Sequence, residues 1–587
     1  MGSTVKNTLD FRQLPSYVQR RFVPQEADLT DLKGVQSLFD RLLDRRIESS
    51  QDLENFVLDF SELDAAIDQQ GTILYIRMTC QTDDEARSRD YQNFIEKIVP
   101  AVKAFEDQFN RKYVSALEKY PLDEVRYGLY TRGIRADLEL FVEKNVELQT
   151  KVDLLSQKYQ SLCGAMTVNF EGKERTLQEM SKYLLEPDRD LRERAWRASS
   201  RRRLDDAKKL DNLFDEMLSL RNEIGKNAGF ANFRDYMFKS LHRFDYAPED
   251  CRQYHRAVER LVVPVWAGIL ESRMKQMNLT QLRPWDTAVD PLGRAPLKPF
   301  EDVDDLVAGC QKIFNRLDKG LGAQFSGIRK EDLLDLASRK GKAPGGYQST
   351  LNESRKPFIF MNAVGVDHDV RTLLHESGHA FHALACANDP LMDYRHGPME
   401  FNEVASMGME LLADGFLGVF YGREDLIRSR INHLEDIVFT LSWVAAIDAF
   451  QHWLYENPKH TAVERKNMWV EIHRRFNGGI VDWSGLEEEH AYLWHRQLHI
   501  FEVPFYYIEY GIAQLGALQL WLNSKKDLQK TLTQYQKTLE SGGSKTLPEL
   551  FKAAGLEFDF SEGAVEPLMK EIEKELKQLA RNETEGP

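Results

Sequence analysis

The chain has 587 residues, of which 42% are apolar and 29% charged, and its formal net charge is −15. This length exceeds what one compact core usually holds, so two or more packed lobes are predicted. The balance of apolar and charged residues is that of a globular protein and excludes a disordered chain. The acidic charge argues against nucleic acid as a partner, and the longest apolar run, about ten residues at 261–270, is too short for a membrane span.

The N-terminal part of the chain, residues 29–159, has apolar residues at every third or fourth position. This period predicts antiparallel helices. Breaks are expected near residues 49–50, Gly71 and Pro121, because Ser, Gly and Pro interrupt helical patterns.

Two short segments follow this helical part. Residues 164–172 alternate between polar and apolar side chains, which predicts a short strand or hairpin. Residues 192–203 carry a basic run with a helical pattern, followed by Asp205 and Asp206. We interpret the run as a solvated helix face rather than a nucleic-acid site.

The middle of the chain contains two irregular stretches and a strand. Residues 278–299 are rich in Pro, Asp and Gly, which predicts a loop or a hinge. Residues 341–347 form a second flexible stretch, and the apolar run KPFIFMN at 356–362 is short enough for a strand.

A candidate metal motif, HESGH, lies in the helical pattern of residues 370–387. Residues four apart share a helix face, so His375 and His379 project side by side, as two imidazole ligands of one ion require. Glu376 lies next to the first histidine, where its carboxylate can accept a proton from a water at the metal. Gly378 costs about 1 kcal/mol relative to Ala inside a helix, which indicates a close approach by another segment.

A catalytic zinc site requires a third protein ligand and one open position. The next helical segment, from about Met399, carries Glu400, Glu403 and Glu410 near one helical face. Their spacing leaves open which glutamate ligates and which one hydrogen-bonds a ligating imidazole. An exposed acidic stripe is the alternative, but the neighbouring residues are apolar.

The segment HESGHAFH, followed by NEVASMGME, resembles the motif of the thimet oligopeptidase and oligoendopeptidase F superfamily, peptidase family M3. The resemblance implies one Zn²⁺ per chain, held by His375, His379 and Glu403, which is placed 24 residues after His379. It also implies that Glu376 is the general base.

Two further residues of these helices occupy positions that resemble recurrent positions in the family. Glu410, seven residues past the third ligand, matches a second acidic position that would support a ligand. His382 resembles a recurrent histidine. We expect it beside the ligands or in the core, because a fourth ligand would close the site.

The resemblance implies a mainly α fold: a two-lobed helical metallopeptidase of the zincin type, with a small β-sheet beside the zinc helix and a deep central channel. Residues 1–160 would form an N-terminal helical region within one lobe, and residues 161–587 the catalytic region. That region would contain the zinc site at 375–410 and an aromatic donor segment at 495–510. The runs PFYYIEY and IDAFQHWLYENP resemble the bacterial oligoendopeptidase F, Pz-peptidase-like branch.

The donor segment would stabilise the negative charge that forms on a peptide oxygen during attack. The best donors are His499 and Tyr507, followed by Tyr510, with Tyr506 possible if the register shifts. Pro504 fits the first turn of a helix, so we expect the three tyrosines on that helix, with Tyr507 and Tyr510 on one face. An aromatic core stripe is the alternative for each tyrosine.

Substrate contacts are expected before each ligand helix. Gly345 and Gly346 would let a peptide backbone approach, and Tyr347 lies beside them. A free strand edge there would bind peptide backbone by strand addition. His396, just before the third-ligand helix, is a further candidate contact.

These features predict a zinc metalloendopeptidase that hydrolyses short unstructured peptides. The alternatives are a peptidyl-dipeptidase or carboxypeptidase, which would use a cation such as Arg496, and a non-catalytic peptide-binding protein, which the general base argues against. Five scattered cysteines and a polar N-terminus favour the cytoplasm. No nucleic-acid or membrane partner is expected, and both a monomer and a homo-oligomer are compatible with the sequence.

Overall fold

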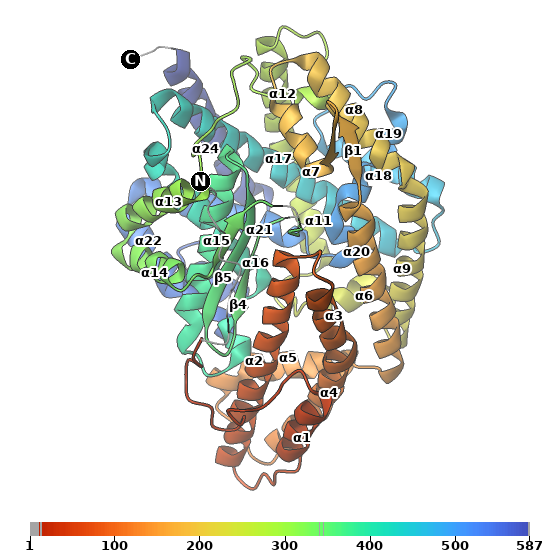
Figure 1. Ribbon diagram of the computed structural model, residues 1–587, viewed down its shortest axis with the longest axis vertical. Helices are drawn as coiled ribbons and strands as arrows, with labels where there is room; N and C mark the ends of the chain where they lie inside the picture. Colours follow the sequence, from red (N-terminus) through yellow and green to blue (C-terminus); the bar gives the residue numbers. More distant parts are fainter. Residues whose placement is uncertain (1–10, 12–13, 340, 344, 585–587) are drawn as a thin grey trace. The chain divides into compact units, whose positions relative to one another are not determined.

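The computed structural model describes residue 11 and residues 14–339, 341–343 and 345–584 (Figure 1). Its elements are mostly helices, with two small sheets, which confirms the mainly α prediction. The chain forms two compact units, each built from three separate segments. Unit 1 comprises Met1–Glu139, Lys298–Tyr421 and Gly516–Phe558, and unit 2 comprises Leu140–Leu297, Gly422–Leu515 and Asp559–Pro587.

Unit 1 joins the N-terminal helices to a three-stranded sheet and its helices. Its elements are α1 (Leu32–Leu43), α2 (Ser50–Cys80), α3 (Glu85–Asn93), α4 (Val99–Leu117), α5 (Glu124–Leu140), α13 (Val303–Leu317), α14 (Lys319–Lys330), β3 (Leu334–Ala337), β4 (Tyr347–Leu351), β5 (Lys356–Ala363), α15 (Asp367–Ala385), α16 (Met399–Ala413), α22 (Leu528–Leu539) and α23 (Leu547–Ala553). The predicted strand at 356–362 is therefore confirmed as β5.

The N-terminal helices pack around a core of aromatic and aliphatic side chains. The predicted breaks near Ser49 and Pro121 are confirmed: the Ser49 side chain caps α2, and Pro121 lies between α4 and α5. The predicted break at Gly71 is wrong, because α2 continues through it. A Cβ at Gly71 would lie 2.7 Å from a ring carbon of Phe94, so this glycine makes room for a packed ring.

The sheet of unit 1 lies beside α15, the helix that carries the HESGH motif (Figure 1). Its strand order is β3-β5-β4, with β5 parallel to β3 and antiparallel to β4. The apolar side chains of β5 are buried because the strand is central and α15 packs against it. Strand β4 therefore forms one edge of the sheet, next to the motif helix. Pro344, within the stretch predicted to be flexible, lies outside the described residues.

Unit 2 is helical apart from one hairpin. Its elements are α6 (Glu143–Gly164), β1 (Thr167–Phe170), β2 (Lys173–Thr176), α7 (Leu177–Ser181), α8 (Arg189–Asp205), α9 (Ala207–Asn227), α10 (Phe233–Ser240), α11 (Pro248–Ala257), α12 (Val263–Gln276), α17 (Arg423–Glu456), α18 (Ala462–Phe476), α19 (Glu487–Ala491), α20 (Leu498–Glu502), the first half of α21 (Ile508–Lys526) and α24 (Glu562–Thr584). Strand β1 confirms the strand predicted within residues 164–172, and it pairs antiparallel with β2, which lies just beyond that segment.

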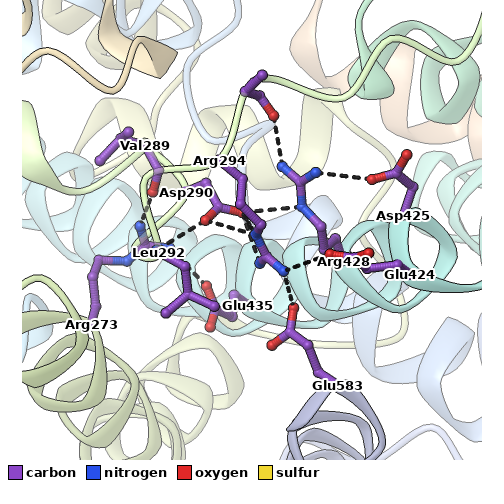
Figure 2. Close-up of polar contacts among 11 residues, drawn as sticks. Arg273, Val289, Asp290, Leu292, Arg294, Glu424, Asp425, Arg428, Glu435 and Glu583 are labelled. Carbon is purple, nitrogen blue, oxygen red and sulfur yellow. Dashed lines mark hydrogen bonds and ion pairs between the residues drawn. The ribbon is translucent and has the colours of Figure 1, made fainter. Parts of the chain in front are cut away.

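The segment 278–299 is irregular, as predicted, but ion pairs hold it to neighbouring helices (Figure 2). Asp290 lies 2.9 Å from Arg294 within the segment and 3.1 Å from Arg428 on α17. Arg294 also lies 2.6 Å from Glu583 on α24. The segment is therefore an anchored loop of unit 2 and not a free linker.

The basic run at 192–203 lies on α8, so its helical pattern is confirmed. The prediction of a solvated helix face is wrong for Arg192, which is 1% exposed. Its guanidinium lies 3.1 Å from the buried carboxylate of Asp286, which also accepts a hydrogen bond from Arg189 at 3.0 Å. The first basic residue of the run thus neutralises a buried charge.

Among the described helices, α17 is long and apolar enough to cross a membrane by length and composition. However, 78% of its most apolar window is buried inside the structure, which is the pattern of a core helix.

Candidate functional site

Two consecutive helices of unit 1, α15 and α16, carry the candidate metal ligands. Helix α15 begins at Asp367, three residues before the predicted start, because Asp369 stabilises its first turn. The Asp369 carboxylate accepts hydrogen bonds from the backbone N–H groups of residues 364–366, at 2.8 to 3.0 Å. Helix α16 begins at Met399, as predicted.

The two helices approach most closely at Gly378. A Cβ at this position would lie 2.6 Å from the carbonyl oxygen of Ala405 and 2.6 Å from the Cα of Ser406. Tyr535 donates a hydrogen bond to the same Ala405 carbonyl at 2.7 Å, which further fixes α16 at this point. The close approach predicted from a glycine inside the motif helix is confirmed, and it brings the ligands of the two helices together.

The side chains of His375, His379 and Glu403 converge on one point. Each histidine Nε2 lies 3.5 Å from Glu403 Oε2, and the two rings are 5.0 Å apart at 81°. Ligands about 2.0–2.1 Å from a tetrahedral zinc lie roughly 3.4 Å from one another, so these separations fit one ion. The histidine side chains are 20% and 17% exposed, which leaves a face of the site open.

Two neighbouring side chains orient these ligands. Glu410 Oε1 lies 2.8 Å from His375 Nδ1, so the carboxylate holds the ring proton at Nδ1 and leaves Nε2 for a metal. Ser406 Oγ donates a hydrogen bond to Glu403 Oε2 at 3.0 Å. The sequence spacing indicated a supporting glutamate but did not single out Ser406, whose only signal is its place one helix turn after Glu403.

Glu376 lies on α15 beside the first ligand and is buried. Burial is the main cause that raises the pKa of its carboxyl above the ordinary value, although the charges of His375 and His379 oppose it. A carboxylate with a raised pKa is a better proton acceptor than an ordinary glutamate. Glu376 is outside the group of converging ligand atoms, as expected for a general base.

His382 lies in the core beside the site and outside the ligand group. Its ring packs edge-on against Phe401 at 6.4 Å, and a Cβ at Gly397 would lie 3.0 Å from its Cε1. Burial, together with the charges of His379 and His396, lowers its pKa to about 3, so the ring is neutral. His382 therefore lies in the core beside the ligands and outside the ligand group, which fits both alternatives.

The candidate substrate contacts of unit 1 lie at the start of β4 and before α16. Gly345 has a positive φ of 94°, a conformation that favours glycine, and Gly346 follows it. Tyr347 opens the edge strand, where its hydroxyl contacts Thr79 at 2.6 Å, so its ring is fixed. His396 is exposed in the segment before α16.

The aromatic donor segment belongs to unit 2, and its backbone differs from the prediction. Pro504 does not open a helix: α20 ends before it, and α21 starts at Ile508. Phe505 adopts a positive φ of 67°, and its N–H donates to Gln451 Oε1 at 2.8 Å. This tertiary contact holds a turn where the pattern predicted a helix, so only Tyr510 of the three tyrosines lies on α21.

The turn nevertheless gathers the predicted donors around one imidazole. The His499 ring lies 4.7 Å from Tyr507, 5.6 Å from Tyr510 and 6.0 Å from Tyr506, measured between ring centroids. All four side chains are half-buried, so they are not an aromatic core stripe.

Two residues that the sequence analysis missed fix the tautomer of His499. The Trp443 indole N–H, which is only a donor, donates to Gln497 Oε1 at 2.8 Å. The Gln497 amide nitrogen must then donate to His499 Nδ1, at 2.7 Å. His499 therefore carries its proton on Nε2, where it can serve as a donor. Burial raises the pKa of the nearby Tyr507 to about 12, so its hydroxyl is also protonated.

Comparisons with known proteins identify the family of the chain. The sequence model of Peptidase family M3 matches residues 182–569, and that of the Peptidase M3 N-terminal domain matches residues 22–141. Neither match reaches residue 160, so a boundary there remains a prediction.

A curated relative matches about half of the chain, and two solved structures match most of it. An oligoendopeptidase F homolog from Borreliella burgdorferi is 24% identical over 296 residues, and the matched segment spans only about half of either chain, 48% of each. An X-ray structure provisionally assigned to oligoendopeptidase F is 31% identical, with a TM-score of 0.89, covering 95% of this chain and 98% of that one. The structure of Pz peptidase A with an inhibitor is 29% identical, with a TM-score of 0.89, covering 95% and 99%. The chain belongs to peptidase family M3, in the branch that resembles oligoendopeptidase F and Pz peptidase.

Proposed function

We propose that the protein is a zinc-dependent metalloendopeptidase that hydrolyses short, unstructured peptides. The observation that carries this proposal is the convergence of His375, His379 and Glu403 on one point, with Glu376 beside them and a face of the site open. Three protein ligands, one open position and an adjacent carboxylate are the components of a hydrolytic zinc site. The names of the relatives, oligoendopeptidase F and Pz peptidase, support the substrate class.

The residues of unit 1 would divide the chemistry among them. His375, His379 and Glu403 would hold a Zn²⁺, which polarises a peptide carbonyl and lowers the pKa of a water when bound. Glu376 would take a proton from the attacking water and then pass it to the leaving amine. Glu410 would keep the His375 proton at Nδ1 throughout.

The donors of unit 2 would act on the peptide oxygen, where negative charge develops. His499 offers its Nε2–H, and Tyr507, Tyr510 and Tyr506 offer hydroxyls around it. One preorganised donor of this kind is worth about 3 kcal/mol in the transition state. The roles of these donors belong to the proposal.

Substrate binding would use the edge of the sheet in unit 1. Strand β4 is an edge strand, so an extended peptide could pair with it through backbone hydrogen bonds and with little side-chain selectivity. Gly345 and Gly346 would admit the peptide backbone, and Tyr347 and His396 would contact its side chains. A deep channel that admits short peptides and excludes folded proteins is part of the same proposal.

A cytoplasmic location also belongs to the proposal. All five cysteines lie in the described part of the chain, and none of them forms a disulfide, which is typical of a reducing compartment.

The substitution Glu376→Gln tests the proposed base. We expect peptide turnover to fall by about 10²- to 10⁴-fold while zinc content stays unchanged, because the amide cannot accept a proton. The exposed Glu96 of unit 1 provides the matched control, since Glu96→Gln makes the same change far from the ligands along the chain. Full turnover in zinc-loaded Glu376→Gln would refute the mechanism.

The products from a mixed peptide library, identified by mass spectrometry, test the substrate class. An endopeptidase releases internal fragments of many lengths, and a chelator should abolish their release. Release of only C-terminal dipeptides or single residues would favour a peptidyl-dipeptidase or carboxypeptidase instead. Binding without cleavage would favour a peptide-binding protein.

A further inference from the structure

A second group of metal-binding side chains lies in unit 2, away from the ligands of α15 and α16 along the chain. Cys251 and His255 are four residues apart on α11, and Asp448 and His452 are four residues apart on α17. Helices α11 and α17 pack together, so two pairs of side chains, each on one helix face, meet between them. All four side chains are buried.

The geometry of this group resembles that of the candidate catalytic site. The ligand atoms of Cys251, Asp448 and His452 all lie within 4.8 Å of one another. His452 Nε2 lies 3.3 Å and His255 Nε2 lies 2.8 Å from the same oxygen, Asp448 Oδ2. The two rings are 5.7 Å apart at 85°, close to the 5.0 Å and 81° of the histidines on α15.

Three buried polar atoms of Asp448 and His452 make no hydrogen bond. Neither ring nitrogen of His452 has a hydrogen-bond partner, and Asp448 Oδ1 has none either. Within the part of the chain that the structure describes, Asp448 is paired with histidines and has no Lys or Arg partner. A buried carboxylate oxygen and buried imidazole nitrogens that make no hydrogen bond each cost free energy unless something compensates for them.

We propose that Cys251, Asp448 and His452 hold a second, buried divalent metal ion of the zinc type. Thiolate, carboxylate and imidazole are the ligands that zinc prefers, and one thiolate with one carboxylate balances its charge. His255 donates its Nε2–H to the Asp448 carboxylate and so orients that ligand, the usual arrangement around a ligating carboxylate.

The surroundings of the group assign this ion a structural role. The rings of Phe238 and Phe505 pack edge-on against His452, at 6.2 and 5.5 Å, and Phe476 packs against His255 at 6.3 Å. These rings exclude water and substrate, so the ion would crosslink α11 and α17 and would not catalyse a reaction. The ion would bind during folding, because the folded structure leaves its ligands buried.

Cobalt substitution of the full-length protein provides the direct test. A Co²⁺–thiolate bond gives a strong charge-transfer absorption in the near ultraviolet, and the proposed catalytic ligands include no sulfur. We expect this absorption in the wild-type protein produced with Co²⁺, its loss in Cys251→Ser, and its retention in Cys310→Ser. Cys310 is also fully buried, in unit 1, and serves as the matched control. Absence of the absorption in the wild-type protein, or its persistence in Cys251→Ser, would overturn the proposal.

Metal counting gives a second measurement that does not depend on a variant that folds. We expect two zinc ions per wild-type chain, of which dialysis against a chelator removes the exposed one and leaves the buried one. The Glu403→Ala variant should contain one zinc ion per chain, the buried one. A single ion per wild-type chain, removed by the chelator, would refute the second site and leave the proposed peptidase site intact. Two ions in the untreated protein with no peptidase activity would instead refute only the proposed function.

Discussion

One methyl group at position 378 should force α15 and α16 apart. The added Cβ would lie 2.6 Å from Ala405 O and from Ser406 Cα, whereas ordinary contacts begin at 3.4 Å. Both are backbone atoms, so α16 must recede by about 0.8 Å, and such overpacking costs roughly 1–3 kcal/mol. Glu403 lies on the same helix, 3.5 Å from both histidine Nε2 atoms, so the displacement moves the third ligand away.

The expected result of Gly378→Ala has two parts. Alanine favours the helix by about 1 kcal/mol, which offsets part of the strain and leaves a net loss of up to about 2 kcal/mol. Zinc affinity should fall about tenfold or more, as when a ligand loses its support. Urea unfolding measures the first quantity, and competition with a chromogenic chelator measures the second.

Gly327 supplies the matched control for this experiment. It lies inside α14, and a Cβ there would meet no atom within 4 Å. Gly327→Ala should therefore stabilise the protein by up to about 1 kcal/mol and leave zinc affinity unchanged. If Gly378→Ala behaved in the same way, the close packing of α15 and α16 would not limit the metal site.

Three further substitutions test other contacts. Glu410→Gln should weaken zinc binding by about 10- to 100-fold without unfolding the protein, which a chelator competition would show; unchanged affinity would contradict its supporting role. Asp286→Asn leaves two arginines without their buried carboxylate and should lower the free energy of unfolding by about 3–5 kcal/mol, measured in urea. Burial opposes the ionisation of Asp335, but Arg339 and Lys342 outweigh it and lower its pKa to about 2. Because this folded pKa is depressed, the stabilisation is present above pH ~4 and is lost as pH falls towards 2, so the melting temperatures of Asp335→Asn and the wild type should converge over that range.

Local patterns predicted the features that depend on one helix or strand. The four-residue spacing placed His375 and His379 on one face, and the apolar run at 356–362 gave β5. The glycine at 378 indicated a close approach before any partner was known. Each of these features follows from the residues of its own element, so the sequence alone could predict it.

Features that depend on distant contacts could not be predicted in this way. The sequence spacing left three glutamates as candidates for the third ligand. Only the packing of α16 on α15 brings Glu403 into the ligand group. Phe505 adopts a left-handed conformation because Gln451, which lies on another helix, accepts its N–H. Gln497 orients His499 only because Trp443 fixes its amide. In each case, the decisive partner lies far away in the sequence.

The two ligand groups show that exposure, rather than ligand type, separates a proposed catalytic site from a proposed structural one. Both place two imidazoles nearly at right angles, with their Nε2 atoms directed at one carboxylate oxygen. The histidines of α15 keep a sixth of their surface or more in contact with solvent, so water and a peptide can reach an ion there. His452 is enclosed by phenylalanine rings, and Cys251 contributes a thiol to a group of three ligands in which the first group has a second imidazole. A chelator should therefore distinguish the two groups by rate: the first should lose its ion from the folded protein, and the second only as α11 and α17 separate.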